Sequence, residues 1–576
     1  MRLAQFTRPL AFAIASVLAS SAVHAALVVD EQFEGTYYNP AQSGRGVNFD
    51  WFQTSATGGI MGMAFYTYDA QGRPYWMLAN AAFSDREFRK SAVDVYAFSG
   101  GSFGNTFTTP TGAVVGKLDV EFLSCNRVKL DFSAAAGSGL VNFNMDLERF
   151  SGAPASCAYR TEFTGCPNGT TQLQNLPRAC ILPQTISGNL ELRNNATYII
   201  NGKTTVGGGR NVQPGTLTIE PGTRIQGIGQ GIDYLVVQPG SKLYAEGTAT
   251  APIVFTGPTD TPGSWAGLVL AGNAVNNGCT GATPCAFEAD SNITFGGSDD
   301  NDSSGALRYV QIRYAGQVIR ENEELNALTL LAVGRGTVID HVQVHAGKDD
   351  GFEMFGGAVN LKHVIGTAVE DDCLDFAEGY TGKIQYAYCK QTATASGDSN
   401  GIESDNKPGA FDLLPRTQPK VANVTLIGVA SGNEGVRIRR GSGGNFYNVV
   451  ATGFGQECLN FNDSATFAAS GSAGTPAASG VLTMSGAALG CAANFEDSGS
   501  DPFLVSAWYR GQSGNSDGTA AALGLSGRFP GASSILLGSG VAVPGDSFFD
   551  TANFKGAFSG AMTDWARGWT MGGTLD

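Results

Sequence analysis

Residues 339–353, IDHVQVHAGKDDGFE, are nearly repeated by residues 361–375, LKHVIGTAVEDDCLD, after a shift of 22 positions. The shift superimposes a His, an Ala and an acidic doublet, and it aligns Glu353 with Asp375. A period in the low twenties with short β-rich runs is typical of a coiled β-solenoid. Equivalent residues of adjacent coils lie one strand spacing apart, about 4.8 Å. Carboxylates that close repel one another unless a cation, a proton or a positively charged ligand lies between them.

Further copies of this pattern extend the repeat along the chain. Residues 217–223 (LTIEPGT) are echoed by residues 235–241 (LVVQPGS) after 18 positions, and residues 433–435 (NEG) by residues 456–458 (QEC) after 23. Runs this short cannot bury a core one by one, but coiling stacks them around a continuous apolar interior. We therefore predict an all-β protein with a right-handed parallel β-helix at residues 186–480, its hand following the general rule for parallel crossovers.

The rest of the chain is predicted to form units that flank the solenoid. Residues 26–155 alternate β-forming and polar residues between Gly-bearing turns, which indicates a small antiparallel β-domain. Residues 156–185 are predicted to form a disulfide-tied linker, and residues 481–576 a C-terminal cap over the open end of the stack. Three insertions are expected to decorate one face of the solenoid, and they are residues 272–304, 392–418 and 464–490.

Residues 1–25 have the pattern of a secretory signal peptide. Arg2 and Arg8 precede a short apolar run, and small residues lead to a cleavage point after Ala25. The run is too short to cross a bilayer, and it is not followed by the Cys that a bacterial lipid anchor needs. We expect a protein that is secreted or associated with the cell surface or outer membrane, with no membrane span and no lipid anchor.

The chain is acidic, with 36 Lys and Arg against 51 Asp and Glu. Removal of the predicted signal takes away two Arg, so the net charge of the mature chain is 34 − 51 = −17. This charge argues against nucleic acid and anionic membrane surfaces as partners, and it favours cations. We expect a monomer with no organic cofactor.

The ten Cys fall into local couples, and in an exported chain they indicate disulfides. A thiolate metal site is disfavoured because no C-x-x-C spacing occurs. The five predicted bridges join Cys125 with Cys157, Cys166 with Cys180, Cys279 with Cys285, Cys373 with Cys389, and Cys458 with Cys491.

Four phrases resemble a large family of exported bacterial β-helix proteins, many of them known only as hypothetical or surface-associated. The phrases are LTIEPGT at 217–223, LTL at 328–330 leading to GRGT at 334–337, KDDGFEMFGG at 348–357, and WARGW at 565–569. This resemblance covers roughly residues 180–576 and implies the fold, not an activity. In the N-terminal unit, GTYYNP and SGRG resemble a small β-domain of exported proteins from Gram-negative bacteria, whose aromatic residues either stack on sugars or build a small core.

A weaker similarity is to the pectin-lyase-like superfamily and, within it, to polygalacturonase-type glycoside hydrolases. Asp350 (or Asp349) would match the first Asp of their site, Asp371-Asp372 the doublet, and Arg437 would stand near the basic element. Arg437 also belongs, with Arg439 and Arg440, to a concentrated basic element of the solenoid where an anionic sugar could dock. The resemblance implies that one carboxylic acid protonates the leaving oxygen while another activates water. The His that follows the doublet in that family is missing here, since the corresponding segment reads TATASG.

The acidic repeats also admit three other interpretations. In a calcium-assisted lyase of the same superfamily, Lys348 or Arg437 would supply the base. In a purely structural interpretation, the doublets cap turns by accepting hydrogen bonds from backbone N–H groups. We favour a cation site, because a ladder built for capping alone would use neutral Asn. The predicted Ca²⁺ ligands are Asp349 and Asp371, and the predicted ligand-binding residues are Lys348, Asp349, Glu353 and Asp375.

Two further groups have the chemistry of metal ligands. Asp300, Asp302 and Ser304 stand at alternate positions before a Gly, like the start of a calcium loop, although the twelfth position lacks the bidentate Glu. His341 and His363 should stack on adjacent coils. We interpret them as a turn or inward-facing pair, because no Asp at matching geometry is evident.

From the sequence we expect an exported protein that binds a polysaccharide or cell-surface glycan, with Ca²⁺, along one flank of the solenoid. The alternatives are an extracellular polysaccharide hydrolase or calcium-dependent lyase, and a structural stalk of the cell surface. The sequence does not identify the glycan, the presence of turnover or the role of the N-terminal unit.

Overall fold

The structure is a computed structural model of the 576-residue chain. The residues that it describes are 29–55, 58–69, 71–84, 87–102, 108–152, 163–174, 178–210, 212–279, 283–320, 323–471 and 480–575. The predicted signal peptide lies outside the described residues.

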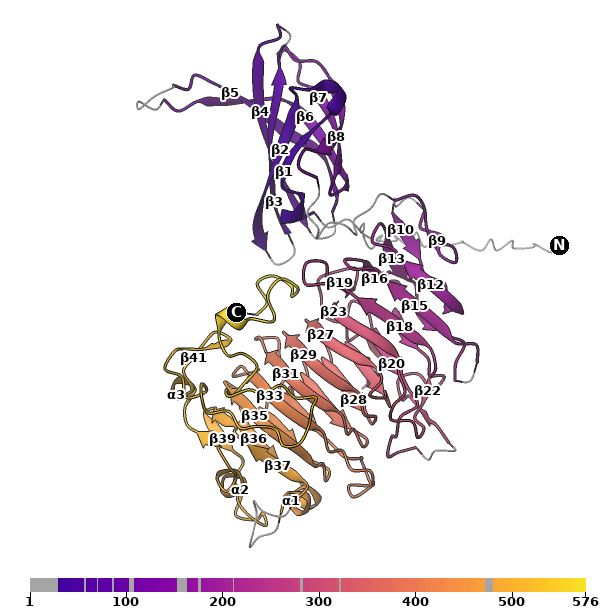
Figure 1. The fold of residues 1–576 in the computed structure, drawn as a ribbon, viewed down its shortest axis with the longest axis vertical. Coiled ribbons are helices and arrows are strands. Elements are labelled where there is room, and N and C mark those ends of the chain that lie inside the picture. Colours follow the sequence, from indigo (N-terminus) through magenta and orange to yellow (C-terminus); the bar gives the residue numbers. More distant parts are fainter. Residues whose placement is uncertain are drawn as a thin grey trace, which may run out of the picture.

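The N-terminal unit is a closed antiparallel barrel of eight strands, drawn in indigo and violet in Figure 1. Its strands are β1 (Gly35–Tyr38), β2 (Gly46–Ser55), β3 (Gly58–Tyr68), β4 (Pro74–Ser84), β5 (Arg89–Ser99), β6 (Thr111–Ser124), β7 (Arg127–Ala134) and β8 (Phe143–Arg149). The barrel closes because β1 pairs with both β2 and β8. Along β3, Met61, Met63 and Phe65 are buried inside while Tyr66 faces solvent, as period-two alternation requires. The predicted antiparallel β-domain is confirmed.

The solenoid that follows contains two long sheets. In the first solenoid sheet, strands of successive coils pair in parallel, apart from β9, which is antiparallel to β10. Its strands are β9 (Thr171–Gln172), β10 (Ala179–Ile181), β12 (Gly188–Leu192), β13 (Thr197–Ile200), β15 (Gly215–Ile219), β16 (Arg224–Gly227), β18 (Lys242–Glu246), β19 (Ile253–Thr256), β23 (Gly305–Arg313), β27 (Val338–His345), β29 (Asn360–Thr367), β31 (Lys383–Lys390), β33 (Lys420–Ile427), β35 (Gly444–Thr452), β37 (Leu482–Ser485), β38 (Ala488–Gly490) and β40 (Ser516–Asp517).

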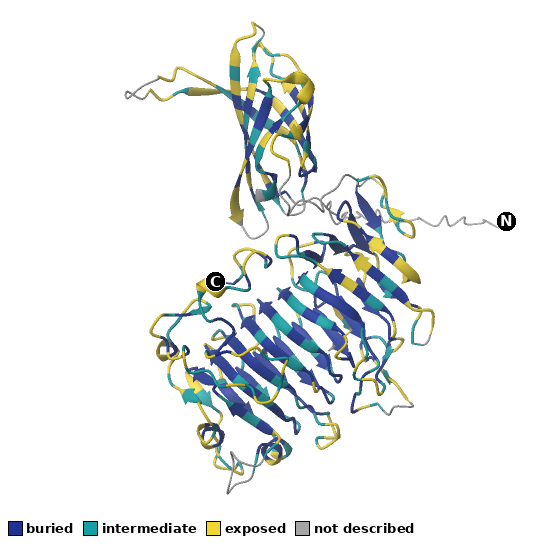
Figure 2. Ribbon diagram, viewed as in Figure 1, coloured by how far each residue is buried: buried dark blue, intermediate teal, exposed yellow. Residues whose placement is uncertain are grey.

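The second solenoid sheet has eleven strands, one from each coil. They are β11 (Thr185–Ile186), β14 (Lys203–Val206), β17 (Tyr234–Val237), β20 (Gly267–Ala271), β26 (Leu328–Leu331), β28 (Phe352–Phe355), β30 (Leu374–Ala377), β32 (Ile402–Ser404), β34 (Val436–Ile438), β36 (Glu457–Phe461) and β39 (Ala493–Phe495). Phe352 and Met354 point into the apolar interior, and Glu353 between them points outward. This alternation repeats from coil to coil, so many residues of the solenoid strands are buried (dark blue in Figure 2).

The strand register agrees with the 22-residue repeat. Ile339 pairs with Leu361 in the first sheet, and Glu353 pairs with Asp375 in the second. The predicted β-helix is therefore confirmed. Parallel pairing also runs past both predicted ends, 186 and 480, because β10 pairs with β13 and because β39 and β40 continue the stack.

The long strands of the first sheet bend at one residue with a left-handed backbone. At this bend stand Tyr309, His341, His363 and Tyr386, with φ of 49°, 58°, 53° and 61°. A left-handed non-Gly residue costs about 1–2 kcal/mol. Stacking offsets part of that cost, since neighbouring rings in this column lie 4.4, 4.3 and 5.1 Å apart, and an aromatic pair contributes about 0.5–1.5 kcal/mol.

Residues 541–575, which we call the C-terminal strap, lie along the outside of the first sheet (yellow in Figure 1). Residues 505–510 of the region predicted as a cap pack against the last coils, since Val505, Trp508 and Tyr509 join the apolar core of the solenoid. The side-chain amides of Gln385, Asn423 and Asn448 donate hydrogen bonds to strap carbonyls at 3.0, 3.0 and 2.9 Å. The outward amides of successive coils thus offer the strap a row of hydrogen-bond partners.

The remaining elements are short. They are α1 (Ser464–Ser470), α2 (Val505–Arg510), α3 (Ala520–Leu523), the 3₁₀ turns η1 (Glu31–Phe33), η2 (Pro40–Gln42) and η4 (Ala561–Thr563), and the two-stranded pairs of β21 (Cys285–Ala286) with β22 (Thr294–Phe295), β24 (Val318–Arg320) with β25 (Glu323–Glu324), and β41 (Leu525–Ser526) with β42 (Phe529–Pro530). In the part of the chain that the structure describes, no helix has the length and apolar character of a membrane span.

Four of the predicted disulfides are present among the described residues, and they join Cys166 with Cys180, Cys279 with Cys285, Cys373 with Cys389, and Cys458 with Cys491. The fifth couple, Cys125 with Cys157, includes Cys157, which lies outside the described residues. Such bonds form and persist in oxidising surroundings, so they indicate an extracellular environment.

Candidate functional site

A column of polar side chains runs along the outer face of the second solenoid sheet. Glu353 pairs with Asp375, Asp375 with Glu403, and Glu403 with Arg437, on β28, β30, β32 and β34. Each lies between two buried residues of its strand, so the alternation turns it outward. Three successive coils therefore carry a carboxylate at one position, about one strand spacing apart.

The turn before each of these strands holds a second column. Asp350 Oδ1 accepts a hydrogen bond from the backbone N–H of Asp372 at 3.0 Å, and Asp372 Oδ1 accepts one from Asn400 at 2.5 Å. Asn400 Oδ1 in turn accepts one from the backbone N–H of Glu434 at 3.1 Å. The turn-capping interpretation is thus correct for one oxygen of each side chain. Turn capping does not explain why Asp350 and Asp372 are charged residues, because the neutral side chain of Asn400 caps its turn in the same way.

Seven carboxylates from these two columns and the neighbouring turn residues form what we call the carboxylate ladder. They fall into three overlapping groups, and within each group one ligand atom per residue lies within 4.8 Å of the others. The groups are Asp349, Asp350 and Asp371; Asp350, Glu353 and Asp375; and Asp372, Asp375 and Glu403. The structure therefore brings together the six carboxylates that the sequence singled out and adds Glu403.

Burial and mutual repulsion shape the ionisation of the ladder. Burial, followed by the charge of neighbouring carboxylates, raises the pKa well above its usual range in Asp350, Glu353, Asp372 and Asp375. Burial also raises the pKa of Glu403 from 4.5 to about 7, against the pull of Arg439 and Arg437. Without a bound cation, several ladder carboxyls therefore hold protons at neutral pH.

The donor atoms of the ladder fit a hard divalent cation. Ca²⁺ takes six to eight oxygen ligands, carboxylates foremost, in flexible geometry. Among the described residues, Oδ1 of Asp375 is buried and has no hydrogen-bond partner, and a buried acceptor without a partner costs about 1–3 kcal/mol. Lys348, which the sequence placed with the ligand-binding residues, is exposed, and its side chain passes beside Gly263 and Gly316 of preceding turns.

Arginines close the ladder at one end. Arg437 lies 3.0 Å from Asp398, 3.4 Å from Glu434 and 3.6 Å from Glu403. Arg439 also contacts Glu403 and lies 2.7 Å from Asp405. The predicted role of Arg437 as a free anchor for an anionic sugar does not match this geometry, because its guanidinium is already shared among carboxylates.

Sequence reasoning missed Glu403 because it assigned residues 392–418 to an insertion. The structure shows that this segment contains β32, a regular strand of the second sheet. One signal was available: Gly401-Ile402-Glu403-Ser404 matches Gly351-Phe352-Glu353-Met354 in its Gly and Glu and in the apolar residue between them. Variable turn length hid the match, since 28 positions separate Asp375 from Glu403 where 22 separate Glu353 from Asp375.

The calcium loop predicted at Asp300, Asp302 and Ser304 has a different role. Asp300 Oδ1 accepts a hydrogen bond from the backbone N–H of Val275 at 3.1 Å, and Asp302 Oδ2 accepts one from that of Asn273 at 2.8 Å. Neither Asp belongs to a group of three acidic or His ligands among the described residues. These carboxylates hold the inserted segment in place by capping separate backbone groups, and they do not converge on one point.

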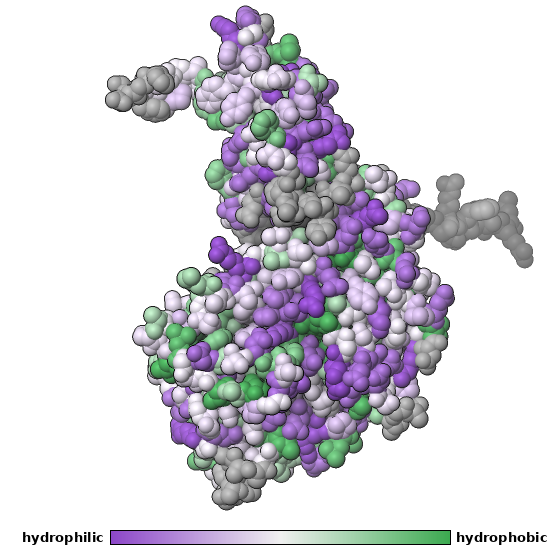
Figure 3. All heavy atoms as spheres, in the orientation of Figure 1, coloured by the Kyte–Doolittle hydropathy of each residue, from purple (hydrophilic) through white to green (hydrophobic). Residues whose placement is uncertain are grey.

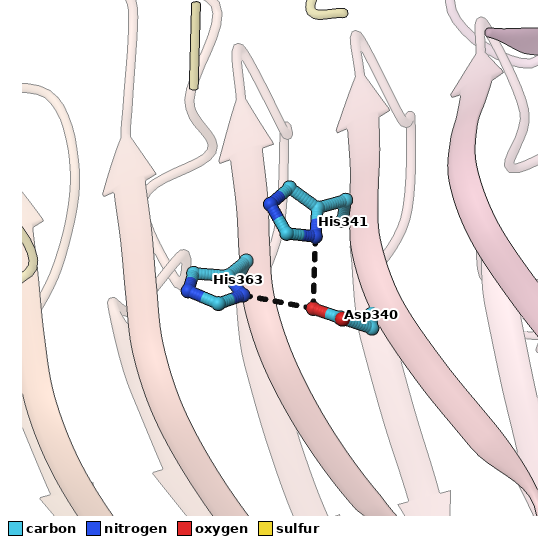
Figure 4. A group of neighbouring side chains, drawn as sticks. All are labelled: Asp340, His341 and His363. Carbon is cyan, nitrogen blue, oxygen red and sulfur yellow. Dashed lines mark hydrogen bonds and ion pairs between the residues drawn. The ribbon is translucent and has the colours of Figure 1, made fainter. Parts of the chain in front are cut away.

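A second group with metal-ligand chemistry lies beneath the strap (Figure 4). The Nδ1 atoms of His341 and His363 lie 2.9 and 2.8 Å from the same oxygen of Asp340, and Trp565 of the strap lies 5.1 Å from the His363 ring. The pair occupies the bend of its strands, as the turn interpretation predicted, but Asp340 supplies the carboxylate that we had not recognised. His363 Nδ1 makes a hydrogen bond with Asp340 Oδ1 at 2.8 Å. His341 Nδ1 lies 2.9 Å from the same oxygen but has no hydrogen-bond geometry to it.

The comparisons agree with this architecture. No curated protein and no solved structure matches the chain. A family model, described as a pectate-lyase-like beta-helix domain, matches residues 184–489. The match takes in most strands of both solenoid sheets, every ladder residue and more than half of the 576 residues. The chain therefore belongs to the pectate-lyase-like beta-helix family.

Proposed function

We propose that the protein binds a polysaccharide along the outer face of the second solenoid sheet, and that the carboxylate ladder holds Ca²⁺ there. The observation that carries the proposal is the convergence of Asp350, Glu353, Asp372 and Glu403 on Asp375, whose Oδ1 is buried and has no hydrogen-bond partner among the described residues. A surface that merely needed turn caps would use more residues like Asn400. The pectate-lyase-like family supports a polysaccharide as the partner.

The ladder carboxylates differ in how deeply they are buried, and this suggests a different role for each. Asp349 and Asp371 are half-buried at the rim and would meet the ion first, while Asp350 lies deeper. Asp375 joins the groups on either side of it, so it would hold the ion nearest the centre of the ladder. A bound Ca²⁺ would supply the positive charge that lets the ladder ionise and that attracts carboxylate or hydroxyl oxygens of a sugar.

The disulfide bridges support a place of action outside the cell. Four disulfides in the described residues indicate an oxidising environment. We propose that the protein is exported from a Gram-negative bacterium and acts at the cell surface or in the medium. Figure 3 supports a water-exposed solenoid, since the face in view is largely hydrophilic with scattered small hydrophobic patches.

Titration calorimetry tests the proposal. Wild-type protein, Asp375→Asn and a control, Glu246→Gln, which removes an exposed carboxylate from an earlier coil, are titrated with Ca²⁺ and then with neutral and acidic polysaccharides. We expect Asp375→Asn to lose Ca²⁺ binding and to weaken polysaccharide binding, while the control matches the wild type. Equal Ca²⁺ affinity in all three proteins would show that the ladder is not the cation site.

Polysaccharide hydrolysis is the second candidate. The observation that favours it is Glu403, whose pKa of about 7 suits a general acid at neutral pH. Against it, Asp350 and Asp372 each commit one oxygen to a backbone N–H. Within each group, ladder oxygens lie within 4.8 Å of one another. This spacing argues against an inverting pair, which is about 6.5–9.5 Å apart, but is near the about 5–5.5 Å of a retaining pair. Assays of reducing ends and of unsaturated products, with Asp350→Asn and Asp372→Asn as variants, decide between binding and turnover.

A further inference from the structure

Outward-facing aromatic residues gather on the barrel. Tyr66 faces Trp76 in the register of β3 and β4, and the two side chains are 55% and 54% exposed. The ring of Trp76 lies 5.8 Å from that of Phe98 on β5, at an interplanar angle of 12°. A second row, from Leu78 on β4 through Tyr96 on β5 to Val114 on β6, continues the patch. We call the two rows the aromatic face, and its members are Tyr66, Trp76, Phe98, Leu78, Tyr96 and Val114.

The aromatic face borders a hollow where the barrel wall parts. β4 and β5 pair at two positions alone, Leu78 with Tyr96 and Ala79 with Val95. Beside them a hollow of about 570 Å³ is lined by Phe98, Tyr96, Asn80 and Asp94 among others. Asn80 brings an amide, and Asp94 a carboxylate that is paired with Lys117 at 2.7 Å.

A glycine keeps the Phe98 ring close to the sheet. A Cβ at Gly112, which pairs with Phe98 across β5 and β6, would lie 2.9 Å from the ring. The absent side chain therefore gives the ring room to lie over the strand. The barrel core is complete without these rings, since it is filled by other side chains such as Met63, Phe65 and Phe122. Exposed rings that pack no core are free to contact a ligand.

The chemistry of the aromatic face and the hollow beside it indicates which class of ligand would bind there. A flat aromatic ring beside an amide and a carboxylate matches a pyranose, which offers an apolar face of C–H groups and a rim of hydroxyls. A stable protein partner needs about 20–30 residues from each side, and the aromatic face has six. Small size and mixed polarity therefore favour a sugar over a second protein.

We infer that the barrel carries a second sugar-binding site, in which Trp76 and Phe98 stack on one pyranose of a polysaccharide and Asn80 and Asp94, about 13 Å further along the strands, bind hydroxyls of another sugar unit of the same polymer. The inference rests on the proposed function, because it takes the same polysaccharide as the partner of both sites. Two linked sites on one polymer raise affinity through effective concentration, with gains of about 10²–10⁴-fold. Loss of the barrel site should accordingly weaken binding about tenfold or more.

The test uses the full-length protein in affinity electrophoresis against neutral and acidic polysaccharides, with and without chelator. The barrel variants are Trp76→Ala and Asn80→Ala, and Phe150→Ala, which removes an aromatic residue that is 71% exposed outside the aromatic face, is the control. Trp76 and Asn80 are exposed, so thermal melting should stay unchanged. We expect both barrel variants to bind about tenfold more weakly in Ca²⁺ and to lose the binding that remains in chelator, while the control behaves like the wild type in both.

Asp375→Asn in the same assay separates this inference from the proposed function. If it weakens binding while Trp76→Ala and Asn80→Ala do not, the barrel site is overturned and the ladder proposal stands. If the barrel variants alone weaken binding, the barrel site stands and the ladder proposal fails. If no polysaccharide binds, or if Trp76→Ala instead releases a protein partner, the barrel inference is wrong.

Discussion

Without Ca²⁺, the free energy of unfolding of the wild type should fall as the pH rises. The Glu403→Gln variant should show a smaller fall. Burial raises the pKa of Glu403 from 4.5 to about 7, so the native state binds its proton more tightly than the unfolded chain does. A carboxyl with a raised native pKa contributes stability below its unfolded pKa and loses it as the pH rises through the native value. The window therefore lies between about pH 4.5 and pH 7.

The size of the effect follows from the shift. The difference of 7 − 4.5 = 2.5 pH units, at 1.36 kcal/mol per unit, corresponds to about 3 kcal/mol of unfolding free energy. Urea unfolding in chelator, at several pH values from about 4 to 8, measures it in the wild type, in Glu403→Gln and in the exposed-site control Glu246→Gln. The wild type and the control should lose the full amount across this range, and Glu403→Gln should lose much less.

Calcium should reverse the trend, because its ligands must be deprotonated and a bound ion holds them so. Its stabilising effect should therefore grow with pH, reaching about 2.7 kcal/mol at a hundredfold excess over the Kd. The reasoning fails if the chelated wild type and Glu403→Gln lose equal stability as the pH rises, or if Ca²⁺ stabilises the protein more at low pH than at high pH.

Three further predictions concern the scaffold. Phe376→Ala, at a fully buried position of β30, should lower the unfolding free energy by about 3–5 kcal/mol in urea, and an equal loss in the exposed Phe150→Ala would contradict this account of the core. Removing the Cys458–Cys491 bridge, which spans 33 residues, should cost about 3–4 kcal/mol, and unchanged melting of the double Ser variant would refute it. Burial lowers the pKa of His345 from 6.5 to about 4. The native state therefore loses stability as the pH falls through this window, and His345→Gln should lose less in thermal melts from about pH 7 to pH 4.

Much of the fold and part of the site could be predicted because they depend on short repeats in the amino-acid sequence. The 22-residue period placed Glu353 opposite Asp375, and the strand register confirms it. A parallel hydrogen-bond ladder forces equivalent positions of adjacent coils to meet, so a period in sequence becomes a column in space. Cys373 and Cys389 were paired for a similar reason, since the stack brings neighbouring turns together.

Glu403 and Asn400 escaped prediction because the length of a turn is not encoded in the strands that flank it. A long excursion between coils leaves the core untouched, so the next strand can follow at any distance along the chain. The free-anchor role of Arg437 failed for another reason. Its partners come from several coils, Asp398, Glu403 and Glu434 among them, and a repeat predicts which positions align but not which side chains turn toward one another.

The amino-acid sequence by itself determined the two kinds of β-structure, the stacking register of the acidic repeats and the local disulfides, because each depends on neighbours within one or two coils. The tertiary structure alone decided how the strap runs. The backbone N–H of Met571 donates a hydrogen bond to the side chain of Gln343 at 2.8 Å, although the two residues are 228 positions apart in the sequence. No local sequence pattern predicts that contact. It also decided that Asp375 Oδ1 is buried without a partner among the described residues. Charge spacing can be read from a repeat, whereas burial depends on every segment that packs around it.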